Sequence, residues 1–350
     1  MRVLLEAAPL TLSSGGLARY TSELSLALAR CFPADEFVLS TDQPFHMPAN
    51  PPANLKRGGG PRSAAERRWW LWGLSREARR LRADLVHGPD FAVPYLPQKP
   101  SVLTLHDLSP WLDPVWHHAA HRVRRRTPVL LKLKIATMVI VPSEIVRKQA
   151  IDRFRLAPQR VITVPEAAAP WLGPIETTPA VPYFLFVGTL EPRKNLTALV
   201  EAWREVRRHH PIDLILAGRR RGDAPELNPA PGLHLLGEVS DSRLAELYSG
   251  ALAFVYPSLY EGFGLPVLEA MQCGACVITT RAAAEAGGDA AIYAEGPQEL
   301  AQAMRQAATQ PDWVAGRRAR SLARAREFSW DRSARLTHQV YEEACRRFAH

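Results

Sequence analysis

The sequence has few cysteines and no long hydrophobic run. Its 350 residues include only 4 cysteines: Cys31, Cys273, Cys276 and Cys345. So few cysteines cannot form a disulfide framework, so we expect a reducing compartment and a cytoplasmic protein. The most apolar stretch, residues 129–141, is interrupted by Lys132 and Lys134 and falls short of the roughly 20 apolar residues of a membrane-spanning helix. Because Glu6 interrupts the apolar start, we expect a first strand there and no secretory signal.

Net charge is absent from the second half of the chain. Residues 1–180 contain 24 Lys and Arg against 15 Asp and Glu, whereas residues 181–350 contain 20 of each, so the net charge of +9 belongs to the first part. A hydrophobic content of 47% excludes disordered, collagen-like and coiled-coil classes. A basic protein of this size could bind nucleic acid, a membrane surface or an acidic substrate, and composition does not choose among these partners.

Short apolar runs alternate with segments of helical period along the chain. In the first half the runs are residues 3–5, 37–40, 85–87, 101–105, 138–141 and 161–164. This alternation predicts βαβ units and parallel sheets. Residues 167–182 contain four prolines and predict an interdomain linker, after which the pattern restarts at residues 183–187. We therefore expect two α/β domains that bind ligands in the loops after their strands.

Two loops of the first domain are candidates for chemistry. Gly15 and Gly16 open a helix expected over residues 17–30, where backbone N–H groups attract anions, although paired glycines there are often simple turns. His106 and Asp107 follow an expected strand. The histidine could contact a sugar hydroxyl or a developing charge, or it could be a structural residue bound to a backbone carbonyl.

The second domain opens with a strand followed by Arg193 and Lys194 at a helix start. Unpaired cations oppose the helix dipole there, so the pair indicates a bound anion such as a diphosphate, which two cations can neutralise without a metal.

Glu261 and Glu269 flank the glycine-rich segment GFGLP. If a helix begins near Pro266, Glu269 lies in its first turn and can accept two hydrogen bonds from a ribose diol. The backbone N–H groups of residues 262–265 can then face an anion at the helix N-terminus.

Taken together, these residues resemble the retaining glycosyltransferases of family 4. The matching segments are SGGLARYTSELSLAL, TLHDLSP, VPSE, FLFVGTLEPRKNL, HLLGEVSDSRLAELYSGALAFVYPSLYEGFGLPVLEAMQCG and GGDAAIYA. The resemblance implies the GT-B fold, in which two Rossmann-like domains face each other across a cleft and a C-terminal helix crosses back to the first domain. The expected boundaries are 1–170 for the acceptor-side domain, 171–182 for the linker, 183–327 for the donor-binding domain and 328–350 for the returning helix.

The same resemblance implies roles for individual residues. Arg193 and Lys194 would bind the donor diphosphate, Glu261 would contact the transferred sugar, and Glu269 would hold the ribose diol. His106 would lie beside the reacting sugar and completes the expected catalytic set. The other donor-binding residues that it implies are Gly15, Gly16, Gly188, Glu238, Val239, Gly262, Phe263, Gly264 and Leu265.

The resemblance also implies the reaction. It is metal-independent in this family, in line with the lack of an Asp-x-Asp cluster, and the anomeric configuration is retained without a nucleophilic carboxylate. The similarity to mannosyl- and rhamnosyltransferases suggests GDP-mannose as donor and a glycan, lipid-linked or small-molecule acceptor. One departure from the family is the short segment of residues 275–291, which lacks a frequent Pro-Glu-Val step. Glu285 could take the place of the glutamate of that step.

Positive charge is concentrated in two segments of the first half. Residues 122–134 carry six cations and no acid, and residues 62–82 carry seven arginines together with Trp69, Trp70, Trp72 and Leu74. These segments could form an interfacial face on anionic lipid at the inner membrane surface, near a lipid-linked acceptor. Alternatively, they are solvated helix faces whose tryptophans pack in the core.

Two further patterns resemble metal sites. Cys273 and Cys276 have the spacing of a ligand pair, but no second pair exists and we expect core packing at a helix end. We assign His117, His118 and His121 to a basic surface or acceptor loop.

Two other functions remain open. A polyanion-binding or nucleic-acid-binding protein would use the basic first half but leaves the two glutamates unexplained, so we expect no nucleic-acid partner. A catalytically silent GT-B subunit would have no need of His106, Arg193, Lys194, Glu261 and Glu269.

Overall fold

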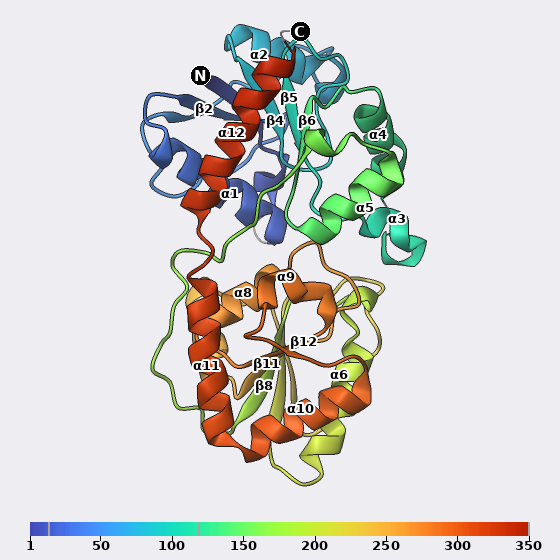
Figure 1. The fold of residues 1–350 in the computed structure, drawn as a ribbon, viewed down its shortest axis with the longest axis vertical. Coiled ribbons are helices and arrows are strands. Elements are labelled where there is room, and N and C mark those ends of the chain that lie inside the picture. The colour runs from blue at the N-terminus through green and yellow to red at the C-terminus, as the bar shows by residue number, and fades with distance from the viewer. Residues whose placement is uncertain (13–14, 118–119, 349–350) are drawn as a thin grey trace. The chain divides into compact units, whose positions relative to one another are not determined.

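The chain divides into two compact units, each with its own parallel sheet (Figure 1). The computed structural model describes residues 1–12, 15–117 and 120–348. Unit 1 comprises Met1–Glu166 and Ser329–His350, and unit 2 comprises Ala167–Phe328. Both units alternate strands with helices, so the α/β prediction is confirmed. Among the described residues, none of the helices has the length and apolar character needed to cross a membrane.

Unit 1 contains a seven-stranded sheet in the order β3-β2-β1-β4-β5-β6-β7. Its strands are β1 (Arg2–Glu6), β2 (Glu36–Ser40), β3 (Leu55–Arg57), β4 (Leu85–Gly88), β5 (Ser101–Thr104), β6 (Met138–Val141) and β7 (Val161–Thr163). Its α-helices are α1 (Gly16–Cys31), α2 (Leu74–Arg80), α3 (Ser109–Leu112), α4 (His121–Lys132), α5 (Glu144–Phe154) and α12 (Trp330–Phe348). Strand order reverses between β1 and β4, which is where ligands bind in doubly wound sheets.

Unit 2 contains a six-stranded sheet in the order β10-β9-β8-β11-β12-β13. Its strands are β8 (Tyr183–Val187), β9 (Asp213–Ala217), β10 (Leu233–Gly237), β11 (Ala253–Tyr256), β12 (Val277–Thr279) and β13 (Ile292–Tyr293). Its α-helices are α6 (Leu196–Arg207), α7 (Asp241–Gly250), α8 (Leu265–Gln272), α9 (Ala284–Gly287), α10 (Pro297–Thr309) and α11 (Pro311–Ala325). The reversal of strand order here lies between β8 and β11.

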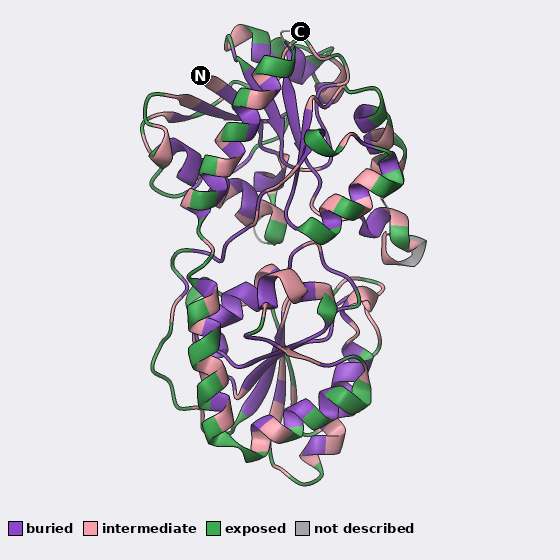
Figure 2. Ribbon diagram, in the orientation of Figure 1, coloured by how far each residue is buried: buried purple, intermediate pink, exposed green. Residues whose placement is uncertain are grey.

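Most strands are buried and most helices expose one side, as Figure 2 shows. Parallel strands covered on both faces need continuous apolar runs, which explains why β4, β5, β6 and β11 are buried along their whole length. The helices keep an apolar stripe against each sheet. In α12, for example, Tyr341 is fully buried and its hydroxyl forms a 2.7 Å hydrogen bond with Nδ1 of His87 in β4.

The segment that we expected to link the domains packs on unit 2. The Gln272 side-chain amide donates to the carbonyls of Ala169 and Leu172, both at 2.8 Å, and the Ile175 N–H donates to Ser249 at 3.0 Å. Leu172 is buried in the core of unit 2. Residues 167–182 form no helix or strand, as their four prolines indicate, but hydrogen bonds anchor the segment to unit 2.

Candidate functional site

The cation pair of unit 2 lies where strand order reverses. Arg193 and Lys194 end a short 3₁₀ turn (Pro192–Lys194) that follows β8. The Lys194 ammonium donates to the Tyr256 hydroxyl at the end of β11 (2.5 Å) and to Glu261 Oε1 in the next loop (2.6 Å). Because β8 and β11 are neighbours in the sheet, the loops that follow them meet. The structure thus brings together three of the predicted catalytic residues.

Glu261 is buried and ionised. Its side chain is 9% exposed, accepts hydrogen bonds from Lys194 and Ser258, and lies 3.6 Å from Arg193 Nη1. Burial alone would raise the pKa of this carboxyl group, but the charges of Lys194 and Arg193 and the two hydrogen bonds outweigh burial and lower it. Conversely, burial and the charge of Arg193 lower the pKa of Lys194 despite its contact with Glu261. The two side chains stabilise each other's charged forms.

A second carboxylate of this network, Glu191, was not predicted from the sequence. Its Oε1 accepts from Arg193 Nη2 at 2.8 Å, and its Oε2 accepts from Arg221 Nη1 at 2.5 Å. Arg221, in the loop after β9, also binds Asp223. The signal was available in the sequence, since Glu191 stands two residues before Arg193 in the same loop. Acids and cations alternate, so Arg193 and Lys194 each contact a carboxylate within unit 2.

Glu269 lies beyond the first turn of its helix, because the helix begins one residue earlier than expected. Helix α8 begins at Leu265 and has no acid in its first turn, so the prediction of a first-turn position is wrong. The side chain is 3% exposed, and its Oε2 accepts a hydrogen bond from the Tyr248 hydroxyl at 3.1 Å. The contact with Tyr248 of α7 fixes the carboxylate on the buried side of α8.

The glycine-rich loop before α8 positions backbone rather than side chains. Gly264 caps α8 with a φ of 102°, and a Cβ there would lie 2.9 Å from Ala283 Cβ, so only glycine fits. Phe263 is buried and packs against Phe328 with ring centroids 5.6 Å apart. Its ring therefore belongs to the core. Gly262 and Leu265 are half-buried on either side.

The remaining predicted donor residues of unit 2 lie after β8 and β10, the two strands that flank β9 in the sheet. Gly188 follows β8, and a Cβ on Gly218 after β9 would come within 2.1 Å of the Gly188 carbonyl oxygen, so the backbone of these loops is in close contact. Glu238 is exposed after β10, and Val239 packs partly against the core of unit 2.

His106 and the two glycines lie in unit 1. Gly15, with a φ of 112°, precedes α1, and Gly16 is its first residue; residues 13 and 14 of the same loop lie outside the described part of the chain. His106 follows β5, and its Nε2 donates to the Pro89 carbonyl at 2.7 Å. Its Nδ1 lies 3.2 Å from Glu166 Oε1. The hypothesis of a carbonyl-bound histidine is thus correct for one nitrogen, and the second nitrogen faces a carboxylate that the sequence did not suggest.

Charge around His106 favours its protonated form. Burial would lower the pKa of the imidazole, but the carboxylate of Glu166, the Pro89 carbonyl and the charge of Asp90 outweigh burial and raise it.

Glu6, at the end of β1, is a buried carboxyl group without a cation beside it to lower its pKa. Its Oε2 accepts from the Ala8 N–H at 3.0 Å, whereas its Oε1 has no hydrogen-bond partner among the described residues. Burial raises the pKa of Glu6 to about 8.

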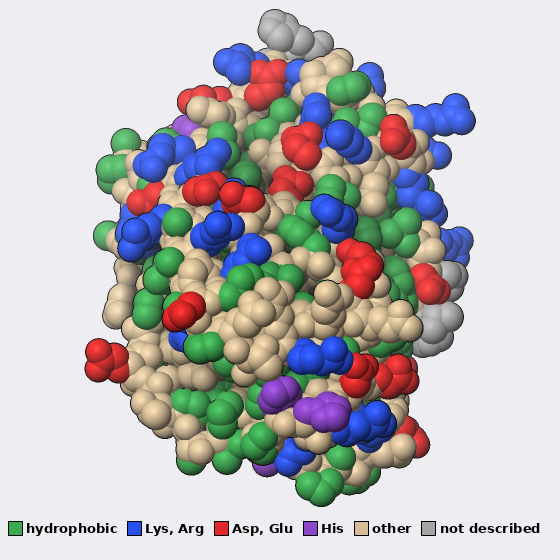
Figure 3. All heavy atoms as spheres, turned by 60° about the horizontal axis from the view of Figure 1, so that its bottom comes forward, with side chains coloured by type: hydrophobic (Ala, Val, Ile, Leu, Met, Phe, Trp, Pro, Cys, Tyr) green, Lys and Arg blue, Asp and Glu red, His purple; other side chains and the backbone are tan. Residues whose placement is uncertain are grey.

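The basic segments are only partly available as surface. Trp69 and Leu74 are buried in the core, so the interfacial hypothesis is wrong for these two side chains and the alternative of core packing is confirmed for Trp69, whereas Trp72 is exposed. The Arg126 guanidinium lies 5.2 Å from the ring centroid of Trp70. Helix α4 and the turn after it expose cations beside apolar side chains, among them Val129 (49%) and Leu133 (68%). On the face drawn in Figure 3, Lys and Arg side chains lie interspersed with Asp and Glu.

The two patterns that resembled metal sites have structural explanations. Cys273 and Cys276 are buried free thiols at the end of α8, and burial raises the pKa of each to about 12, so the core-packing prediction is confirmed. His117 forms a 2.7 Å hydrogen bond with Ser109, and His118 lies outside the described residues. In the part of the chain that the structure describes, His, Cys, Asp and Glu form no group of three suited to a metal ion.

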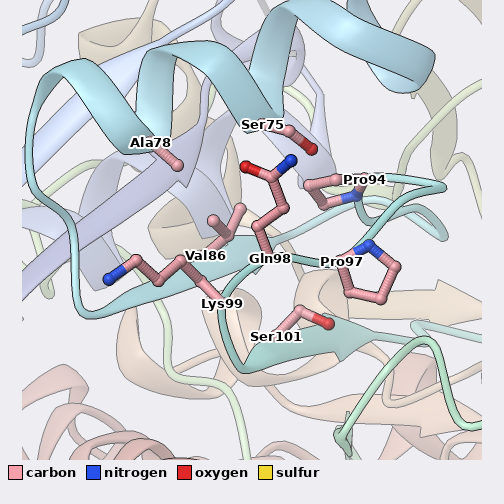
Figure 4. A pocket seen from close by; sticks show the side chains of 8 residues that line it. All are labelled: Ser75, Ala78, Val86, Pro94, Pro97, Gln98, Lys99 and Ser101. Carbon is pink, nitrogen blue, oxygen red and sulfur yellow. The ribbon is translucent and has the colours of Figure 1, made fainter.

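A small pocket of unit 1 lies away from these loops. Figure 4 shows its lining, which is Ser75, Ala78, Val86, Pro94, Pro97, Gln98, Lys99 and Ser101. It lies against α2 and the beginning of β5, whereas His106 follows the end of that strand. The pocket is a packing gap beside α2 and is distinct from the candidate site.

Comparison with known proteins identifies the family. Residues 14–170 match glycosyltransferase family 4, and residues 181–310 match the glycosyl transferases of group 1. The chain is 32% identical over 286 residues to the O-antigen chain mannosyltransferase B of Escherichia coli, which covers 74% of each chain.

Solved structures share the fold. Sucrose-phosphate synthase from Thermosynechococcus elongatus matches 98% of both chains with a TM-score of 0.76 and 19% identity. WaaG, a glycosyltransferase involved in lipopolysaccharide biosynthesis, matches 96% of this chain and 98% of its own with a TM-score of 0.69 and 18% identity. The fold is therefore GT-B, and the chain belongs to the family 4 glycosyltransferases.

Proposed function

We propose that the protein is a retaining mannosyltransferase that moves mannose from GDP-mannose to a glycan, lipid-linked or small-molecule acceptor. The observation that carries this proposal is the buried contact of Lys194 with Glu261, with Arg193 beside it, at the point of unit 2 where strand order reverses. A diphosphate bound there gains two cations from one loop. The mannosyl group is supported by the mannosyltransferase from Escherichia coli to which the chain is 32% identical.

The cations would act mainly as the glycosidic bond breaks. As the bond from C1 to phosphate lengthens, the sugar becomes oxocarbenium-like and the diphosphate gains negative charge, which Arg193 and Lys194 stabilise. An ammonium group has three protons, and Lys194 gives one each to Tyr256 and Glu261, so the third can bind a phosphate oxygen. Donor binding would thus add a partner to Lys194 without removing Glu261.

Retention would follow from attack on the face that the diphosphate leaves. The acceptor oxygen forms the new bond to C1, and its proton passes to the leaving phosphate, so that GDP and the mannosylated acceptor are the products. Glu261 is committed to Lys194 and Ser258 and has no role as a nucleophile in this scheme. Glu269 would accept hydrogen bonds from the ribose diol of the donor. We propose that no bound metal takes part.

A donor and acceptor screen tests the function directly. We expect thermal stabilisation by GDP and not by UDP, ADP or dTDP, because a ligand that binds only the folded state raises its apparent stability. We also expect mannose transfer that persists in excess EDTA, with the α configuration of the donor preserved in the product by NMR. Stabilisation by none of the four nucleotides would contradict the enzyme function, and an inverted product would contradict retention.

We further propose that the exposed face formed by α4 and the turn after it contacts anionic lipid at the inner surface of the membrane. The exposed residues of this face are Arg122, Arg125, Val129, Lys132, Leu133 and Lys134. Cations beside exposed apolar side chains are typical of helices that lie in a membrane interface. Residues 62–82 are less suited, because Arg80 binds both Glu66 and Glu77 and two of the apolar side chains are buried.

A matched pair of charge reversals tests the membrane contact. Lys134→Glu on the proposed face should weaken binding to vesicles of anionic phospholipid at low salt by about fivefold or more, since a cation near such a surface is worth about 1 kcal/mol. Lys56→Glu, the same charge change on β3, should have little effect. Equal effects of the two variants would show that only net charge matters.

A further inference from the structure

The environment of His106 contains a group that the family resemblance did not supply, Glu166. Glu166 is buried and is the last residue of unit 1 in the first part of the chain. Its Oε1 lies 3.2 Å from Nδ1 of His106, 60 residues away in sequence. The preceding residue is also fixed, because the Ser333 hydroxyl on α12 donates to the Pro165 carbonyl at 2.5 Å.

Both ring nitrogens of His106 face acceptors. The Pro89 carbonyl can only accept, so the Nε2 that binds it at 2.7 Å carries a proton. A carboxylate can also only accept, so a proton on Nδ1 would satisfy the contact with Glu166. A ring protonated on both nitrogens is an imidazolium, and the His106 side chain is only 12% exposed to water that would screen its charge.

The ring is held in place by its neighbours. Tyr20 of α1 meets it edge-on with centroids 4.6 Å apart, and the Tyr20 hydroxyl is hydrogen-bonded to Thr104 at 3.0 Å. Thr104 is hydrogen-bonded in turn to His87 at 2.8 Å, and His87 to Tyr341 of α12 at 2.7 Å. His87 is neutral, because burial lowers its pKa to about 3. This series of hydrogen bonds holds Tyr20 against the His106 ring and adds no charge beside it.

Other charged groups near His106 act in the same direction or are occupied. The charge of Asp90, in the loop after β4, favours protonation of the imidazole. The Asp107 carboxylate accepts from the Ser109 N–H and hydroxyl at 2.8 and 2.6 Å. Glu166 is the carboxylate in direct contact with the ring.

We propose that Glu166 is a positioning residue that keeps the His106 ring oriented and doubly protonated, so that His106 acts in sugar transfer as a fixed cation and hydrogen-bond donor. This inference deepens the proposed function and rests on it only for the role in transfer. It excludes His106 as a general base, because neither nitrogen has a free lone pair. A fixed cation of this kind would favour negative charge that develops on a bound substrate during transfer.

NMR titration of histidines in the full-length protein tests the protonation state without any substrate. We assign the His106 signal by its loss in His106→Gln. We expect its titration midpoint to lie above that of an ordinary imidazole and to fall by about 1 to 3 pH units in Glu166→Gln, because an opposite charge at this distance shifts a midpoint by that amount. Glu166→Asp should restore part of the shift. Asp152→Asn, which changes an exposed carboxylate of α5, should leave the midpoint unchanged.

Kinetics with the donor identified by the screen tests the role in transfer. In Glu166→Gln we expect kcat to fall about tenfold at pH 8 and to recover toward pH 6, with little change in the KM for the donor. An unchanged midpoint in Glu166→Gln would overturn the inference. A shifted midpoint with unchanged kcat would confirm the protonation and overturn the catalytic role. If the wild-type protein transfers no sugar, the proposed function fails and takes the catalytic role with it, while the titration still decides the protonation.

Discussion

Glu6 of unit 1 and Glu261 of unit 2 are both buried near the carboxyl ends of parallel strands, yet their pKa values shift in opposite directions. Glu261 touches Lys194 and lies near Arg193, and the pKa of its carboxyl group is lowered. Glu6 has an unsatisfied Oε1 among the described residues, and burial raises its pKa to about 8. Burial is common to both, so the cations decide the charge.

The same contrast separates the candidate sites of the two units. In unit 2, cations and carboxylates are buried together in a network that holds Arg193 and Lys194 in place. In unit 1, the polar group at the end of β5 is a histidine with one carboxylate, and the many cations of the unit lie mainly on the surface. A net charge of +9 in the first half therefore says little about catalysis, while the neutral half holds the cations that we propose bind a diphosphate.

The largest effect should come from removing the Lys194 ammonium group of unit 2. Lys194→Met leaves Glu261 buried with Arg193 3.6 Å away as its nearest charge. We expect a loss of about 10²–10³-fold in transfer rate, since the variant lacks a donor to the leaving group. We also expect a loss of about 3–5 kcal/mol in the free energy of unfolding, because a buried charge loses its partner. Initial rates and denaturant unfolding measure the two effects.

The double variant Lys194→Met with Glu261→Gln is the control. It removes the stranded charge, so it should regain most of the stability and none of the activity. If Lys194→Met is as stable as the wild type at pH 8, the contrast with Glu6 is unfounded.

The second prediction concerns the buried carboxyl group of unit 1, Glu6, and the pH dependence of protein stability. A buried acid with a raised pKa contributes stability that is present below its unfolded value of 4.5 and is lost as the pH rises toward about 8. Glu6→Gln cannot ionise, so it should be more stable than the wild type at pH 9 by a few kcal/mol, at most about 5. At pH 4 the two proteins should have the same stability. Urea unfolding at both pH values measures the difference, and a constant difference would indicate a packing effect instead.

The third prediction tests whether donor binding belongs to unit 2. Glu269→Ala should weaken binding of the nucleotide sugar by about 10–100-fold, because hydrogen bonds to a charged group are worth about 1.5–3 kcal/mol. Isothermal titration calorimetry measures the affinity. Tyr248→Phe, which keeps the carboxylate and removes its 3.1 Å hydrogen bond, should have a smaller effect. Unchanged affinity in Glu269→Ala would falsify the assignment of this residue to the ribose.

The smallest effect should come from Arg221, which lies at the edge of the network of charged side chains around Arg193 and Lys194. Arg221→Gln removes one partner of Glu191, which then holds Arg193 less firmly. We expect the KM for the donor to rise about fivefold, equivalent to one hydrogen bond of about 1 kcal/mol, with kcat nearly unchanged. Arg220→Gln, the exposed neighbour, serves as control and should behave like the wild type. A large fall in kcat would mean that Arg221 touches the reacting groups.

Local patterns predicted the architecture well. Alternating apolar runs predicted the strands of both sheets except the outer strands β3 and β13, which are short. The position of Arg193 and Lys194 after a buried strand indicated an anion site. Local patterns failed for residues whose role depends on a contact with a residue far away in the sequence. Glu191, Glu166 and Glu6 stand in ordinary sequence surroundings, and their importance comes from what they touch. Trp69 was left open between a lipid-facing and a core position, because the sequence pattern does not distinguish the two; the structure places it in the core.

The sequence by itself determined the two α/β units, the loops after their strands and the family, because periodicity, glycine and proline are read over a few neighbouring residues. Only the tertiary structure decided which charges meet. Lys194 and Glu261 are 67 residues apart, and they touch because the strand order places β8 beside β11. Burial and distance together set the charge of each carboxyl group, and both arise only when the sheet is assembled.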